Sequence, residues 1–440
     1  MSTSADTSVL PADAAFAAED ASRHNWMLLA FVVLIPLQNI YEGYFPRGGG
    51  GLNFLNLMFI GSLLVAWRCG GSLVRAGLNG WVLVYLGVSV ISLLIGFGNV
   101  SDSALHANAL KDQAIAVSFV FLAQLSTLGS STVRRLLSAS LLPLPYMLMV
   151  VFDQHNAVKS WHYSHDMRIQ GTMSNLGANE LAAFFVTAML VALGLLIGAR
   201  AHLRLRLWCA AAAACSGIGI ALTYSRTAYV AVLLGALCIV VLRGLRLRVL
   251  VPGLLLMLAL PAVLPLSVLE RFSSIEVAEG ARDESTENRF QFWETAGENF
   301  KERPLLGSGY HTFHHVEINP RLTDTHNFFL RELTEKGLLG AFALLGLLYA
   351  MGRLLLRGLR AAAPDSLEYG LALGMCGAFI ALLCGNCFGD RFTHYPMIAH
   401  FWLYLGLVLR NLSLAAPASP DVVEPLYEER PNKVRTHRFR

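Results

Sequence analysis

Long runs of apolar residues, separated by short polar turns, constrain this 440-residue chain more than any other feature. The runs are about 15–22 residues long, close to the ~20 residues that a helix needs to cross the core of a bilayer. Charged residues make up 15% of the chain, against roughly 25% in soluble domains. This pattern excludes a soluble globular enzyme and a disordered chain, and it predicts an all-α, polytopic integral membrane protein.

The apolar runs predict about 12 transmembrane helices. Their approximate ranges are 26–41, 52–67, 80–97, 108–126, 134–152, 176–199, 205–222, 227–242, 249–268, 328–351, 367–388 and 393–411. The first range lacks an Ala-x-Ala end, so we interpret it as a retained helix and not as a cleaved signal peptide.

Arginine and lysine are unevenly divided between the two sets of alternate short loops. One set holds more than twice as many of them, including the pair Arg134 and Arg135 and the group Arg353, Arg357 and Arg360. By the positive-inside rule this richer side faces the cytoplasm, together with both termini. The net charge of +4 is too small to indicate a nucleic-acid partner, so membrane lipids are the predicted surroundings.

One polar segment, residues 269–327, breaks the rhythm of short loops on the external side. Segments of this length are usually functional or separately folded. Residues 283–287 are typical of an acidic helix start, and residues 288–300 carry apolar side chains at four-residue spacing before Pro304. We therefore predict a short helix here and a second short piece over residues 311–318. The chain divides into an N-terminal tail (1–25), transmembrane helices 1–9 (26–268), the external loop (269–327), transmembrane helices 10–12 (328–411) and a C-terminal tail (412–440).

Three arginines lie on the side of the membrane that is otherwise poor in basic residues: Arg168, Arg226 and Arg289. An arginine next to hydrocarbon is unfavourable unless it reaches water or an anionic partner. Guanidinium groups bind phosphate oxygens in a bidentate manner, so a phosphorylated or diphosphate-linked lipid is the predicted partner. The alternative is that these side chains only extend to the interface.

His326 lies where the external loop meets the tenth predicted helix, beside Asn327. The N-terminus of a helix favours anions, and nearby arginines would disfavour a protonated imidazole. A neutral imidazole at pH 7 is what a general base requires. The alternative is a packing histidine at the membrane interface.

Other polar residues of the external side allow further interpretations. His311, His314, His315 and Glu317 have a spacing that could hold zinc on a helix, but a solvated loop face explains them equally well, and we predict no metal and no cofactor. The adjacent Asp390 and Arg391 are interpreted as a local ion pair that could also line a cavity.

At these residues the sequence resembles the O-antigen ligase family, within the wider ligase/polymerase superfamily of bacterial surface-polysaccharide assembly. The similar stretches are Pro304-Leu305-Leu306-Gly307-Ser308-Gly309, His326-Asn327-x-x-Leu330, Glu335-x-Gly337-x-x-Gly340, Arg168 with Gly171, and Ser225-Arg226. The resemblance extends to the architecture, because the family has about twelve spans and one large periplasmic loop before the histidine.

The resemblance implies transfer of a glycan from undecaprenyl diphosphate to a hydroxyl of the lipid A–core oligosaccharide, at the periplasmic face of the bacterial inner membrane and without metal or nucleotide. His326 would remove the proton of the acceptor hydroxyl. Arg289 would stabilise the diphosphate as it leaves, and Arg226, Arg168 and Asn327 would bind substrate. Direct attack by the acceptor would invert the anomeric centre.

Glu335 stands nine residues beyond His326, which is ~13 Å along a helix that rises ~1.5 Å per residue. This distance is too great for Glu335 to orient the histidine, so we predict a buried polar contact for it. Gly337 and Gly340 predict close packing between helices.

Other functions fit the same residues. An O-antigen polymerase, or a protein O-oligosaccharyltransferase of the same superfamily, would use the same histidine and arginines. A transporter of an anionic glycolipid is an alternative from another class, although the sequence shows no pair of interrupted spans in matching halves.

Overall fold

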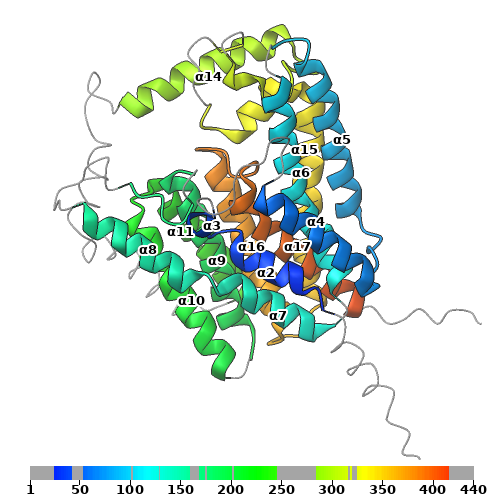
Figure 1. The fold of residues 1–440 in the computed structure, drawn as a ribbon, viewed down its shortest axis with the longest axis vertical. Helices are drawn as coiled ribbons and strands as arrows, with labels where there is room; N and C mark the ends of the chain where they lie inside the picture. The colour runs from blue at the N-terminus through cyan, green and yellow to red at the C-terminus, as the bar shows by residue number, and fades with distance from the viewer. Residues whose placement is uncertain are drawn as a thin grey trace, which may run out of the picture.

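The computed structural model describes residues 24–41, 53–100, 103–127, 129–158, 168–173, 176–200, 203–244, 284–315, 318–319 and 325–415. All regular elements in these ranges are helices, and they pack into one bundle (Figure 1). Within the described residues, eight helical segments are long and apolar enough to cross a membrane. They are α5 (Gly77–Gly96), α7 with α8 (Ser130–Leu141 and Leu144–Ala157), α9 (Ala178–Gly198), α10 (Leu203–Leu222), α11 (Arg226–Arg243), α15 (Phe328–Ala361), α16 (Leu367–Asn386) and α17 (Tyr395–Ala415).

Three predicted spans that fall in the described residues are not among these eight segments. The first is divided into α2 (Trp26–Leu34) and α3 (Gln38–Tyr41), because Pro36 has no N–H to continue a helix. The second is α4 (Phe54–Cys69), which has only 16 residues. The fourth is α6 (Ser103–Ser126), in which Lys111 and Asp112 lower the hydropathy. The predicted range 249–268 lies outside the described residues.

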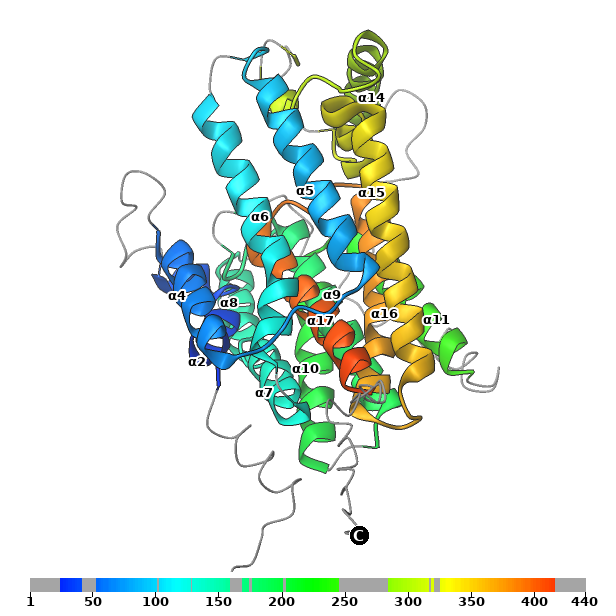
Figure 2. The same ribbon diagram turned by 90° about the vertical axis from the view of Figure 1, so that its right-hand side faces the viewer.

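Close backbone contacts hold α9, α11 and α16 together in the bundle. A Cβ added to Gly198 would lie 2.8 Å from Cα of Gly370, and one added to Gly235 would lie 2.8 Å from the carbonyl oxygen of Gly377. Backbones that approach this closely need residues without side chains at the contact. In Figure 2, α5, α6 and α15 run lengthwise beside one another on another flank of the bundle.

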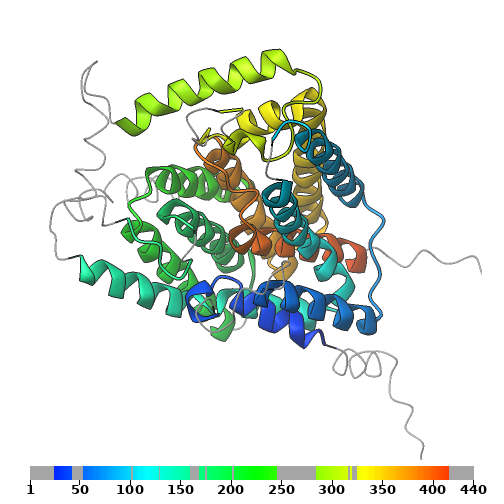
Figure 3. The ribbon, with the colours of Figure 1, turned by 45° about the horizontal axis from the view of Figure 1, so that its top comes forward.

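The helix predicted in the external loop is confirmed as α14 (Glu284–Glu302). It lies across one end of the bundle (Figures 1 and 3). The indole N–H of Trp293 donates to the carbonyl of Thr325 at 3.0 Å, and Thr334 donates to the carbonyl of Ala296 at 3.2 Å. The second predicted piece, 311–318, contains the 3-10 turn Thr312–His314 among its described residues.

Helix α15 is interrupted at Gly337, where φ is +61° and ψ is −159°. The interruption exposes backbone groups on both sides of Gly337, and the segment 304–309 pairs with them. The hydrogen bonds are Ser308 N–H to Thr334 O (3.0 Å), Gly309 N–H to Glu335 O (2.9 Å), Leu338 N–H to Pro304 O (2.8 Å) and Leu339 N–H to Leu305 O (3.2 Å). Two of the short motifs of the sequence therefore form one docked unit.

The predicted role of Gly337 is wrong, and that of Glu335 is confirmed. Gly337 allows the helix to break and contacts the backbone of Leu305 and Leu306, whereas a Cβ on Gly340 would meet Lys336 of its own helix. The Glu335 side chain is 2% exposed. Its carboxylate accepts hydrogen bonds from the N–H groups of His311 (2.9 Å) and Phe313 (3.2 Å).

The substitution Gly337→Ala is expected to destabilise the protein by about 1–3 kcal/mol or more, because a side chain is strained at this positive φ and its Cβ would lie 2.5 Å from the carbonyl carbon of Leu305. Thermal unfolding of the purified protein in detergent measures the change. Gly80→Ala on α5 is the matched control, since nothing lies within 4 Å of a Cβ there. Equal stability of the two variants would contradict the assigned role of Gly337.

Candidate functional site

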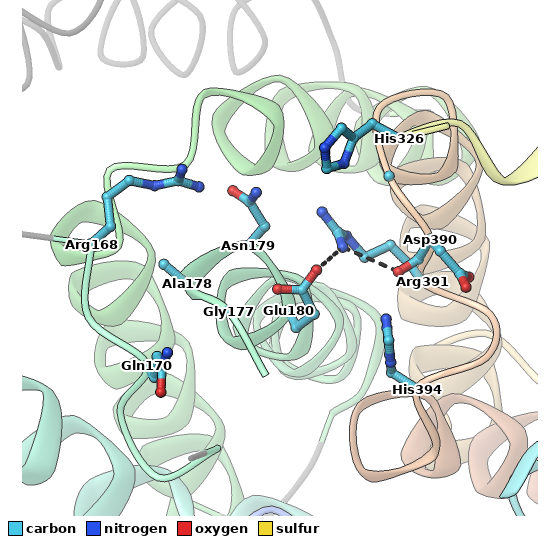
Figure 4. Close-up of a pocket in the computed structure, with 11 residues that line it drawn as sticks. Arg168, Gln170, Gly177, Ala178, Asn179, Glu180, His326, Asp390, Arg391 and His394 are labelled. Carbon is cyan, nitrogen blue, oxygen red and sulfur yellow. Dashed lines mark hydrogen bonds and ion pairs between the residues drawn. The ribbon is translucent and has the colours of Figure 1, made fainter. Parts of the chain in front are cut away.

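A polar cavity of about 410 Å³ lies at the end of the bundle that α14 crosses. Four segments supply its walls: the segment before α9, the first turn of α9, His326 just before α15, and the turn between α16 and α17 (Figure 4). The lining residues are Arg168, Gln170, Gly177, Ala178, Asn179, Glu180, His326, Gly389, Asp390, Arg391 and His394.

His326 lines this cavity, as the general-base hypothesis requires. Its backbone has a φ of +48°, a conformation that is uncommon for a residue with a side chain and that is found more often at functional sites. Its ring lies 6.3 Å from that of Phe292 on α14. The next residue, Asn327, caps α15, because its side-chain oxygen accepts from the N–H of Leu330 at 3.1 Å. Asn327 is not among the residues that line the cavity.

The turn between α16 and α17 is fixed by Asp390, which is 3% exposed. Its carboxylate pairs with Arg331 and accepts from Thr393 Oγ1 and from the N–H of Phe392. Burial by itself would raise the pKa of the Asp390 carboxyl, but Arg331, His394 and these hydrogen bonds hold that pKa below its usual range. The charge of Asp390 is therefore retained near neutral pH, and the turn that carries Arg391 and His394 is held in place.

Arg391 lies in the middle of the cavity and is 4% exposed. Its guanidinium pairs with Glu180 and donates to the Asp390 carbonyl at 3.1 Å (Figure 4). The predicted ion pair between Asp390 and Arg391 is therefore wrong, because each side chain takes a partner from another helix. The two residues do line one cavity, as the alternative interpretation expected.

Arg168 enters the cavity from the opposite wall (Figure 4). Its segment is held by Gln154, which accepts from the Gly171 N–H (2.8 Å) and donates to the Gly171 carbonyl (3.0 Å). The Nε atom of Arg168 is buried without a hydrogen-bond partner, and no described residue forms an ion pair with the side chain. A buried donor without a partner is unfavourable, so this guanidinium is suited to an anionic ligand.

The other two predicted arginines are placed differently. Arg226 is the first residue of α11 and does not line the cavity. Its neighbour Ser225 donates to the side-chain oxygen of Asn179, which does line it, at 2.9 Å. Arg289 belongs to α14, three residues before Phe292, and its side chain lies outside the described part of the structure.

Among the lining residues that were not predicted from the sequence are the polar side chains of Asn179, Glu180 and His394. A signal for the first two was present, because an amide and a carboxylate open an otherwise apolar run of 21 residues. His394 follows Asp390 and Arg391 in the turn between α16 and α17, and the same reasoning that singled out that pair could have included it.

The histidines considered for zinc do not line the cavity, and they contact other histidines. His315 Nε2 is 2.8 Å from Nε2 of the buried His106, and the rings of His311 and His314 are 4.6 Å apart. Burial, together with the neighbouring His314, Arg331 and His106, lowers the pKa of His311 to about 2. Within the described residues, which do not include Glu317, no group of three or more His, Cys, Asp or Glu side chains could hold a metal ion.

The cavity thus combines the imidazoles of His326 and His394 with the guanidinium groups of Arg168 and Arg391. Among the described residues, only the second guanidinium forms an ion pair with a carboxylate. Such a site can bind an anion and accept a proton next to it.

Comparison with curated proteins gives no match for this chain. A family model described as O-antigen ligase matches residues 211–345. The matched range contains Arg226, α14 and His326, and it ends beyond the break of α15 at Gly337. Residues 211–345 are therefore similar to an O-antigen ligase domain, in agreement with the resemblance found in the sequence.

Proposed function

We propose that this protein transfers a glycan from undecaprenyl diphosphate to a hydroxyl of the lipid A–core oligosaccharide and so completes lipopolysaccharide. The proposal depends on one observation above all: His326, Arg168 and Arg391 line the same cavity. The family match supports the enzyme class, a glycosyltransferase of the O-antigen ligase superfamily. The apolar helices support a multi-pass membrane protein. In this proposal both termini are in the cytoplasm and the cavity opens to the periplasm.

The proposed reaction is a single displacement. The acceptor hydroxyl gives its proton to His326, its oxygen forms the new bond to the anomeric carbon, and the bond from that carbon to the diphosphate oxygen breaks with inversion. Arg168 and Arg391 bind the diphosphate and stabilise the charge that it gains. Because Glu180 pairs with Arg391, the diphosphate must compete with this carboxylate or share the guanidinium with it.

Two further arginines keep a role in the proposal. Arg289 precedes Phe292 by three residues in α14, and Phe292 packs against His326, so we propose Arg289 as a further ligand of the leaving diphosphate. Arg226 is adjacent to Ser225, which contacts the cavity residue Asn179. We propose that Arg226 contributes to donor binding from outside the cavity, with Asn327 positioning His326 through its cap of α15.

The test is a reconstitution of the purified protein with undecaprenyl-diphosphate glycan and rough lipopolysaccharide. A product that joins the glycan to the lipid A–core, and that needs both substrates, is the expected result. Extension of the glycan on its own carrier would favour a polymerase, and modification of an added protein acceptor would favour the protein glycosyltransferase. Movement of the glycolipid across proteoliposomes without a new glycosidic bond would favour the transporter.

The substitution Arg168→Lys is expected to weaken donor use by about 10–100-fold in kcat/KM, because an ammonium group cannot reproduce the two-point contact of a guanidinium with phosphate. Initial rates at varied donor concentration measure the change. Arg303→Lys is the matched control, since Arg303 is exposed just beyond α14 and does not line the cavity. If both variants kept wild-type rates, Arg168 would have no part in donor binding.

A further inference from the structure

A second charged groove, of about 990 Å³, lies at the opposite end of the bundle from the His326 cavity. Its walls come from the start of α7, the connection between α9 and α10, and the start of α16. This end carries the arginine-rich loops, which the positive-inside rule places at the cytoplasmic surface. Nothing in the proposed glycan transfer uses this groove.

The groove has more positive than negative charge. Arg134, Arg200 and Arg204 line it together with Asp365 and Glu368.

Of the arginines that line the groove, Arg200 forms an ion pair with Asp365. The Asp365 carboxylate is 3.0 Å from Nε of Arg200 and 2.6 Å from a terminal nitrogen of Arg243. Arg134 and Arg204 form no ion pair with any described residue. Four arginines are therefore set against two carboxylates, which leaves an excess of positive charge at Arg134 and Arg204.

The backbone adds to this positive potential. The helices α7, α10 and α16 all begin at the groove, at Ser130, Leu203 and Leu367. The unpaired N–H groups of a helix start, together with the helix dipole, attract anions. The start of α16 is capped by the side chain of Ser366, so the starts of α7 and α10, together with the guanidinium groups of Arg134 and Arg204, make the groove suited to a phosphate.

An apolar hollow of about 620 Å³ continues from this groove along α2 and α7. Arg134 and Ser138 line both spaces, and the hollow is otherwise bordered mainly by aliphatic side chains, including Leu29, Val33 and the exposed Leu142. On the other side of Arg134, Trp208 borders the charged groove, and tryptophan is typical of the membrane–water interface. The combined shape is cationic at one end and apolar at the other.

We propose that these two connected spaces bind an anionic phospholipid, with its phosphate at Arg134 and Arg204 and an acyl chain in the hollow between α2 and α7. The inner leaflet is rich in anionic lipids, and each basic residue near it strengthens their binding. The occupant is an amphiphile and not a free anion, because the apolar hollow is continuous with the cationic groove through Arg134.

Binding of phosphatidylglycerol and phosphatidylcholine to the delipidated protein, measured by native mass spectrometry, tests the proposal. We expect phosphatidylglycerol to bind about tenfold more tightly or better, and the double variant Arg134→Gln/Arg204→Gln to lose this preference. Arg206→Gln is the matched control, because Arg206 is exposed on α10 but does not line the groove. Equal binding of both lipids by the wild type, or an unchanged preference in the double variant, would overturn the proposal.

Two further binding measurements distinguish a lipid ligand from a free anion. Leu142→Asn is expected to weaken phosphatidylglycerol binding, since Leu142 borders the apolar hollow, while binding of inorganic phosphate stays unchanged. If inorganic phosphate bound as tightly as the lipid, or if Leu142→Asn did not change the affinity for phosphatidylglycerol, the hollow would not bind an acyl chain. The groove would then be a site for free anions, and the proposal would fail. These readouts do not depend on glycan transfer, so they are separate from the proposed function.

Discussion

Replacing His326 by alanine is expected to lower the rate of glycan transfer by about 10²–10⁴-fold, the usual contribution of a positioned general base. His326 lines the cavity with Arg168 and Arg391, and in the proposed reaction its imidazole takes the proton of an acceptor that attacks a donor bound by those arginines. Donor binding is expected to change little, because the diphosphate contacts are assigned to guanidinium groups. The measurement is kcat for transfer, together with the Kd of the donor.

The matched control for this substitution is His394→Ala. His394 lines the same cavity from the turn between α16 and α17, and its loss is expected to affect the rate much less than the loss of His326. If His394→Ala removed activity and His326→Ala did not, the base would be His394. Wild-type turnover in both variants would remove imidazole catalysis from the mechanism.

The substitution Glu332→Ala is expected to destabilise the protein by about 3–5 kcal/mol, because it leaves Lys336 as an uncompensated buried charge. The two side chains are 1% and 0% exposed, and Lys336 Nζ lies 2.9 Å from the Glu332 carboxylate. The ammonium group also donates to Tyr85 Oη (3.2 Å) and Ser89 Oγ (3.0 Å) of α5. The ammonium group of Lys336 therefore connects α15 to α5.

Removing both charges at once separates the ion pair from the packing around it. The double variant Glu332→Leu/Lys336→Met is expected to lose much less stability than Glu332→Ala, because apolar residues of similar size often replace a buried pair at little loss. Thermal unfolding in detergent gives both values, and the difference between them reports how much of the loss comes from leaving Lys336 buried without its partner. A double variant that is less stable than Glu332→Ala would contradict this account.

Helices whose start, apolar spacing and end are all encoded within one short stretch could be predicted from the sequence. The acidic start, the four-residue spacing and Pro304 all act within one short stretch, and α14 forms there. The spans 176–199 and 367–388 are predicted equally well, since α9 and α16 have continuous apolar runs. His326 and Arg168 could be expected to meet because both stand at external helix ends, and both line the cavity.

The partners of the charged groups could not be predicted in this way, because they depend on contacts distant in the sequence. Arg391 pairs with Glu180, 211 positions away, and not with the adjacent Asp390. The break at Gly337 also depends on a remote segment, because residues 304–309 supply hydrogen bonds that a helix interior would otherwise provide. A hydropathy pattern averages over these positions and therefore predicts one continuous span.

The pairing of residues 304–309 with the interrupted start of α15 has a practical consequence for hybrid proteins. These two segments share four backbone hydrogen bonds around Gly337, and Gly307 fits against the Glu335 backbone only because it has no side chain. A chimaera that takes one segment from a relative with a different loop length would lose the register of the other. Exchanges intended to change acceptor choice should move residues 304–340 as a single cassette.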